Sequence, residues 1–73
     1  MTFKKTNPLQ WKMTHKNYTV YIFRWLGNFH STYYMTIDVE RFDGQYYETF
    51  RVVNEMEFYK LNEAKKYAKD YIN

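Results

Sequence analysis

Apolar and polar residues alternate in several stretches of the chain, which is the pattern of β-strands with one buried face. The clearest case is 33–53, where two runs rich in β-branched and aromatic residues flank Asp43 and Gly44, a pair typical of a two-residue hairpin turn. Such a turn pairs Ile37 with Phe50. This register places alternate side chains on one face, namely Tyr33, Met35, Ile37, Val39, Tyr46, Phe50 and Val52.

Two further tight turns are expected, at 16–17, where the asparagine tolerates a positive φ, and at 27–28. Counting outward from these turns pairs Met13 with Val20 and Val20 with Met35. The registers of the three hairpins agree on which residues share a face. They predict a meander of four antiparallel strands at about 9–15, 18–26, 29–42 and 45–54.

After residue 54 the apolar spacing changes to that of a helix, with Phe58, Leu61, Ala64, Ala68 and Ile72 on one side. We therefore expect an α+β fold, in which a four-stranded antiparallel meander sheet carries one C-terminal helix on one face (ββββα). The sheet residues expected under the helix are Leu9, Trp11, Met13, Val20, Ile22, Met35, Ile37, Phe50 and Val52.

The composition narrows the class of protein. The length of 73 residues suits one domain, so we take 1–73 as a single domain with 1–8 as a flexible arm. The chain has no cysteine and is 23% aromatic, so aromatic bulk or a partner must supply the stabilisation that disulfides would give. No apolar run reaches the roughly 20 residues of a membrane span, and no signal peptide is visible. We expect a cytoplasmic protein without membrane contact.

One helix covers only one face of a sheet, so the opposite face should stay open. That face is richer in aromatic residues than a solvated surface requires, and Tyr, Trp and Arg dominate binding hot spots. Two other interpretations stay open: the sheet or the arm 1–8 could cover these rings, or the face could join two copies of the chain. The expected partner-binding residues are Lys12, Tyr21, Phe23, Trp25, His30, Tyr34, Tyr47 and Arg51.

Charge bears on the choice of ligand. The net charge of +3 is low for a dedicated DNA-binding protein, and the lysines gather near the two ends of the chain. Bases could stack on the rings, with Lys12 and Arg51 at the phosphates. However, Asp38 and Glu40 share this face and repel phosphate. A protein partner is therefore favoured, nucleic acid is the alternative, and a homodimer is the third candidate.

The sequence offers little support for catalysis. The two histidines have no cysteine partner, and Ser31 beside His30 points to the opposite face of a strand. Asp38 and Glu40 share a face, as a carboxylate pair would, but a cross-strand ion pair with Arg51 explains them more simply. We therefore expect no enzyme activity, no cofactor and no metal.

The segment from Phe58 to Ala68, FYKLNEAKKYA, resembles the helix of many small sheet-plus-helix proteins of bacteriophages and mobile elements. Some of those proteins are DNA-binding arms of the integrase N-terminal type, and others are accessory proteins that inhibit host factors, such as anti-CRISPR and other anti-defence proteins. The DNA-binding arms present basic residues on their strands, whereas Asp38, Glu40 and Glu48 lie here. The resemblance therefore implies an inhibitor of a bacterial host protein, acting in the host cytoplasm.

Overall fold

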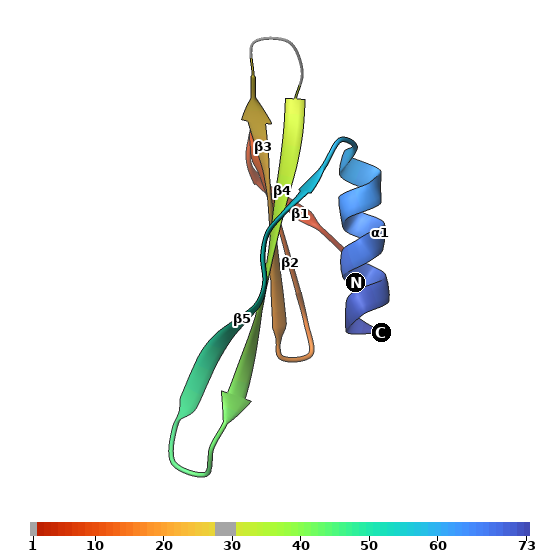
Figure 1. Cartoon of the computed structure of the whole chain (residues 1–73). Coiled ribbons are helices and arrows are strands. Elements are labelled where there is room, and N and C mark those ends of the chain that lie inside the picture. Colours follow the sequence, from red (N-terminus) through yellow and green to blue (C-terminus); the bar gives the residue numbers. More distant parts are fainter. Residues whose placement is uncertain (1, 28–30) are drawn as a thin grey trace.

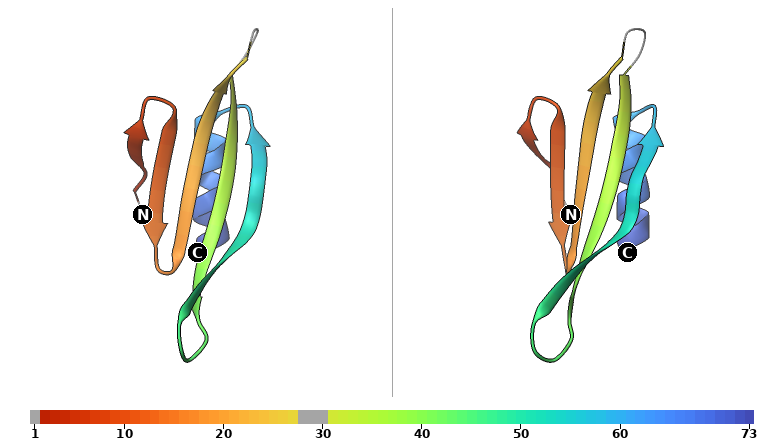
Figure 2. Two further views of the ribbon diagram at one scale, coloured as in Figure 1. Left: turned by 90° about the vertical axis from the view of Figure 1, so that its left-hand side faces the viewer. Right: turned by 60° about the vertical axis from the view of Figure 1, so that its left-hand side comes forward.

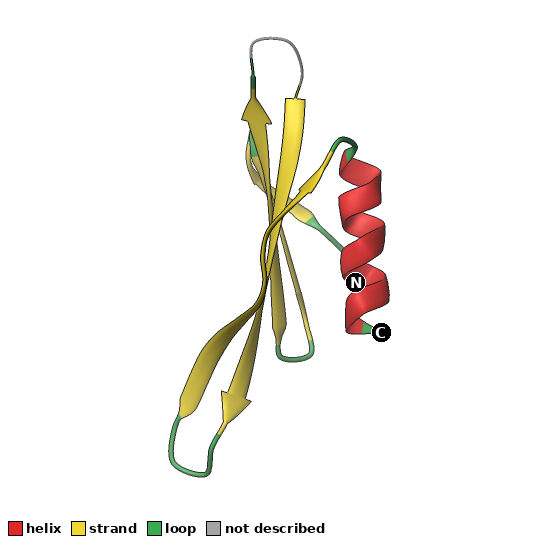
Figure 3. Cartoon of the chain, viewed as in Figure 1, coloured by secondary structure: helices red, strands yellow, loops and turns green. Residues whose placement is uncertain are grey.

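The computed structural model describes residues 2–27 and 31–73. The strands form one antiparallel sheet in the order β1-β2-β3-β4-β5, and the helix α1 lies against one face of it (Figure 1, Figure 3). The predicted α+β class with a C-terminal helix is confirmed, but the sheet formed by the described residues has five strands instead of four. The elements are β1 (Lys4–Asn7), β2 (Gln10–His15), β3 (Tyr18–Leu26), β4 (Ser31–Phe42), β5 (Tyr47–Phe58) and α1 (Leu61–Ile72).

The additional strand, β1, lies in the segment that was expected to be a flexible arm. It pairs with β2, so that Lys4 stands opposite Lys12. The turn between the two strands closes through Asn7, whose side-chain Oδ1 accepts a hydrogen bond of 2.9 Å from the Leu9 N–H. All residues of β1 are exposed. The alternation that marks the other strands is therefore missing here, which is why the sequence pattern did not indicate it.

The β2–β3 register is as predicted, but the next two hairpins are each displaced by two positions. Val20 faces Ile37 instead of Met35, and Phe50 faces Val39 instead of Ile37. A shift of two residues by itself does not change the face to which a side chain points, because side chains of a strand alternate with a period of two. In β2, β3 and β4 the predicted division into two faces is therefore kept, although the predicted pairs of the β3–β4 and β4–β5 hairpins are wrong.

The displacement in the β4–β5 hairpin comes from a longer turn. The Asp43 carboxylate accepts hydrogen bonds from the N–H groups of Gln45 (2.9 Å) and Tyr46 (3.1 Å). These bonds hold the pKa of Asp43 below its ordinary value. Gly44 takes a φ of +104°, where glycine is favoured. Tyr46 therefore belongs to the turn, not to the face that the two-residue turn assigned to it.

Two irregularities in the β4–β5 ladder each advance the register by one residue. As a result Ile37 faces Val53, and Val53 packs against the core in the place predicted for Val52. Glu55 follows with a φ of +52°, a conformation that costs a residue with a side chain about 1–2 kcal/mol. No glycine marks this site, so the sequence gives no sign of it.

In the β2–β3 turn the residue with positive φ is Lys16 (+56°), not the asparagine as predicted. Asn17 instead attaches the turn to β4. Its Nδ2 donates to the Glu40 carbonyl oxygen at 2.7 Å, and its own carbonyl oxygen accepts from the Glu40 N–H at 2.8 Å. Beyond this point β4 and β5 continue as a projecting hairpin, so the molecule measures 49 × 20 × 19 Å (Figure 1).

The hydrophobic core lies between α1 and the sheet face that α1 covers (Figure 2). The helix can lie close because its buried side includes the small residues Ala64 and Ala68. It begins after Lys60 without a side-chain cap. The described residues include no helix long and apolar enough to cross a membrane. The buried core residues are Met13, Val20, Ile22, Met35, Ile37, Ala64, Ala68 and Ile72.

Three residues predicted for the core are exposed instead. Leu9 lies in the turn between β1 and β2. Phe50 stands opposite Val39, near the point where the β4–β5 hairpin leaves the rest of the sheet. Val52 is turned outward by the irregularity next to Val53. Each error has a local backbone cause, and none moves a residue of β2, β3 or β4 to the wrong face.

Candidate functional site

The sheet face opposite α1, here called the open face, is not covered by any element of the described chain (Figure 2). The first residues could have crossed it, but β1 runs along the edge of β2 instead. Phe3 packs against the core on the helix side, where the Lys65 Nζ lies 5.7 Å from its ring centroid. No element of the described chain therefore shields the open face from solvent.

Four rings from β3 and β4 form the aromatic patch of this face: Tyr21, Phe23, Trp25 and Tyr34. The rings of Tyr21 and Phe23 stack with centroids 6.4 Å apart and planes at 15°. Phe23 also faces Tyr34 across the two strands. Phe23 is 43% exposed and Trp25 is 58% exposed, so the face does not curl over them. Half of the predicted binding residues thus lie together.

Threonines form the floor between the rings. Thr32 stands opposite Trp25 and Thr36 stands opposite Tyr21, and both threonines are buried. A short side chain between large ones is shielded by them even where no other element covers the sheet. The result is a shallow depression of about 450 Å³, lined by Gln10, Tyr21, Phe23, Thr36, Asp38, Arg51 and Glu55.

Two predicted cations flank the aromatic patch in different ways. The Arg51 Nε donates to Asp38 Oδ1 at 3.1 Å, which is the predicted cross-strand ion pair, and this bond raises the pKa of Arg51. Lys12 instead places its Nζ 5.6 Å from the Tyr21 ring centroid, a cation–π contact. The charge of Arg51 is already matched, whereas that of Lys12 can still meet an anion.

The remaining predicted residues are not part of this cluster. Tyr47 stands opposite Phe42 at the far end of the β4–β5 hairpin, with ring centroids 4.9 Å apart. The polar residues Thr36, Asp38 and Glu40 separate this pair from Tyr34 along the same face. Tyr47 thus belongs to a second aromatic pair at the hairpin tip. His30 lies outside the described residues.

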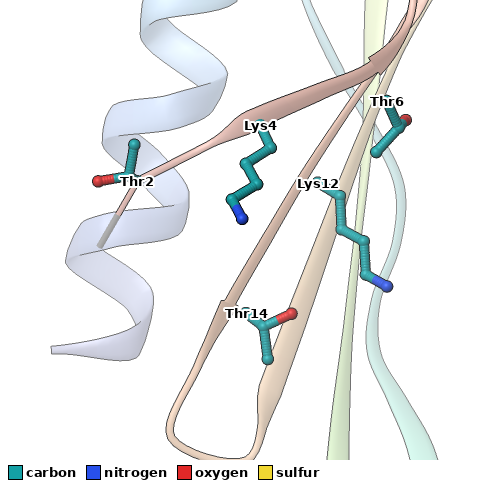
Figure 4. Close-up of a pocket in the computed structure, with 5 residues that line it drawn as sticks. All are labelled: Thr2, Lys4, Thr6, Lys12 and Thr14. Atoms are coloured by element: carbon teal, nitrogen blue, oxygen red, sulfur yellow. The ribbon is translucent and has the colours of Figure 1, made fainter.

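The sequence pattern did not indicate the part of the open face formed by β1. A second depression, of about 340 Å³, lies there beside Lys12 (Figure 4). Lys4 enters this site only because β1 pairs with β2, and a strand without apolar alternation gives no signal in the sequence. The lining residues are Thr2, Lys4, Thr6, Lys12 and Thr14.

The charged groups of the open face can be compared with those of a metal or catalytic centre. Within 2–27 and 31–73 no three histidine, aspartate or glutamate side chains lie close enough to hold a metal ion. Asp38, the most central carboxylate, is bound to Arg51. Comparison of the chain with known protein families, with curated proteins and with solved structures finds no match.

Proposed function

We propose that this chain is a non-enzymatic binding protein whose partner, another protein, docks on the aromatic patch. The observation that carries the proposal is the exposure of Phe23 and Trp25 on a sheet face that no described element covers. Exposed aromatic clusters of this kind mark contact surfaces more often than they mark solvated faces. The resemblance of the closing helix to phage and mobile-element accessory proteins makes a bacterial host protein, inhibited by this contact, the partner that we propose.

The charges of the open face support a protein ligand over a nucleic acid. Its cations Lys4, Lys12 and Arg51 are balanced by Asp38, Glu40 and Glu57, with Glu55 close by at the irregularity of β5. Nucleic-acid-binding surfaces need a clear excess of positive charge to displace counterions. The excess lysines of this chain lie largely on and before α1, such as Lys60 and Lys66, away from the aromatic patch.

The test compares two double variants with matched changes in exposed area. The first, Phe23→Ser with Trp25→Ser, removes two rings of the aromatic patch. The control, Phe50→Ser with Leu26→Ser, removes side chains of nearly equal exposure, 44% and 58%, that alternate to the opposite face. Each immobilised variant is exposed to bacterial lysate with and without nuclease treatment, and retained proteins are compared with those of the parent chain.

The proposal expects a protein that the parent and the control retain and that the aromatic-patch variant releases, while circular dichroism shows that all three are folded. Equal retention by both variants would contradict it. Loss of the protein after nuclease treatment would assign the surface to nucleic acid, the second candidate. Light scattering on the free chain tests the homodimer, which predicts a dimer that Phe23→Ser with Trp25→Ser dissociates.

A further inference from the structure

The β1 end of the open face carries two lysines without an anionic partner. Lys4 and Lys12 stand directly opposite each other in the β1–β2 ladder, and like charges in that position destabilise a sheet. In the described part of the chain neither ammonium group takes part in an ion pair. Both side chains line the depression of about 340 Å³, reaching it from neighbouring strands (Figure 4).

The lining of this depression suits an anionic group. Besides the two ammonium groups it contains the hydroxyls of Thr2, Thr6 and Thr14, and it contains no acidic residue. Ammonium and hydroxyl groups both donate hydrogen bonds to carboxylate oxygens, and the charge-assisted bonds are the stronger. An anion placed here would also relieve the repulsion between the two lysines.

The lysine pair is continuous with the aromatic patch. Lys12 stands opposite Tyr21 in the β2–β3 ladder, and its Nζ lies against the Tyr21 ring. The open face therefore presents cations and hydroxyls at the β1 end and exposed rings on β3 and β4. A ligand that covers both parts must carry negative charge next to apolar surface.

We infer that the partner contributes an acidic segment, whose carboxylates bind between Lys4 and Lys12 while neighbouring apolar side chains bind on Tyr21 and Phe23. This inference rests on the proposed function and specifies the chemistry of its partner. Two strand spacings, about 10 Å, separate β1 from β3. An extended peptide covers that distance in about three residues, so the segment carries its acidic and apolar residues at about that separation.

The distribution of carboxylates on the open face favours a peptide over a phosphate chain. A nucleic acid that continued from Lys4 across the aromatic patch would bring phosphates to Asp38, Glu40 and Glu57. A peptide can place its acidic residues at the lysine pair alone and present neutral side chains to the remainder of the open face. Single-stranded nucleic acid is therefore included in the test as the competing ligand.

The probe is a short synthetic peptide that carries glutamates about three residues away from leucines. It is titrated into the isotope-labelled full chain, and binding is followed by amide chemical shifts. The test variant is Lys4→Gln with Lys12→Gln. The control is Lys60→Gln with Lys66→Gln, which changes net charge equally at exposed lysines outside the open face. A peptide with glutamine in place of glutamate and a single-stranded oligothymidylate complete the set.

We expect saturable shifts at Lys4, Lys12 and Tyr21 with the glutamate peptide, and weaker binding by about threefold to tenfold in the test variant but not in the control. The glutamine peptide should match that loss. Equal affinity of parent and test variant would overturn the inference, and so would tighter binding of the oligothymidylate at the same residues. If the test variant binds as tightly as the parent while Phe23→Ser with Trp25→Ser does not bind, the acidic segment is wrong and the proposed function stands. If neither double change weakens binding, both are wrong.

Discussion

The two faces of the sheet are built from the same strands but by opposite means, as the neighbours Ile22 and Phe23 show. Ile22 is completely buried beneath α1, whereas Phe23 points away from the helix and keeps nearly half of its surface in solvent. The helix face uses aliphatic side chains and two alanines to bring elements close together. The open face uses large rings above buried threonines. Because successive side chains of a strand point to opposite faces, a sheet can place the residues that form its core on one face and the residues that contact other molecules on the other.

The largest expected difference is between the variants Ile22→Ala and Phe23→Ala. Removing Ile22 side-chain atoms leaves a cavity beneath α1 and should lower the free energy of unfolding by about 2–5 kcal/mol. Removing the exposed ring of Phe23 should cost about 1 kcal/mol or less. Urea denaturation of both variants measures the difference, and equal losses would mean that Phe23 belongs to the core.

The close approach of α1 to the sheet can be tested with larger side chains. Ala68 is fully buried, so Ala68→Leu should destabilise the chain by about 1–3 kcal/mol through overpacking. Lys66 lies on the same helix but is exposed, and Lys66→Leu should leave the free energy of unfolding nearly unchanged. An equal loss of stability in the two variants, measured by thermal unfolding, would show that α1 does not pack closely against the sheet.

The displaced register of β5 predicts that adjacent valines differ. Val53 packs against the core, whereas Val52 is turned outward. Val53→Ala should lower the free energy of unfolding by about 1 kcal/mol, and Val52→Ala by less than about 0.5 kcal/mol. A larger loss for Val52→Ala than for Val53→Ala in chemical denaturation would mean that the simple hairpin register is correct and that Val52 lies on the covered face.

The positive φ of Glu55 predicts a substitution that stabilises the chain. Glu55→Gly removes the side chain from a left-handed conformation and should raise the free energy of unfolding by up to about 1 kcal/mol. The control is Glu57→Gly, since Glu57 lies in β5 without a positive φ. Glycine there should cost about 0.5–1 kcal/mol. Destabilisation by both variants would argue against the irregularity at Glu55.

The smallest expected effect is at the tip of the projecting hairpin. Hydrogen bonds from the Gln45 and Tyr46 N–H groups lower the pKa of Asp43 below its ordinary value. A lowered pKa in the folded state means that these bonds stabilise the turn above the ordinary pKa and are lost as the pH falls through the folded-state value. The amide signals of Gln45 and Tyr46 should therefore titrate with a midpoint below the ordinary pKa of an aspartate. Asp43→Asn should abolish that titration, and a midpoint above the ordinary value would contradict the turn geometry.

The sequence was sufficient to predict the features that depend only on the alternation of side chains between the two faces of the sheet. Alternation placed Val20 and Ile22 under the helix and Tyr21 and Phe23 on the open face, because a displacement by two residues does not change the side to which a side chain points. It was also sufficient for the helix, since Ala64 and its apolar neighbours recur at helical spacing.

Features that depend on backbone detail could not be obtained in this way. The carboxylate of Asp43 lengthens a turn that the Asp-Gly pair alone assigns to two residues. Glu55 adopts a positive φ although it is not a type that favours it. β1 has no apolar alternation at all, and the lysine pair of Lys4 and Lys12 exists only through its pairing with β2. The acidic-segment site was therefore invisible in the pattern of residues.

We propose that the partner contacts the open face and not the helix face, and the two tryptophans report directly on this contact. Trp11 is half-buried on the helix side against Tyr33, and Trp25 is exposed on the open face. Fluorine NMR of the chain labelled with 5-fluorotryptophan gives one signal for each, assigned with Trp11→Phe and Trp25→Phe. A soluble paramagnetic agent should broaden the Trp25 signal more strongly in the free chain, and the partner should protect Trp25 while leaving Trp11 unchanged. Protection of Trp11 alone, or equal broadening of both signals in the free chain, would contradict the account.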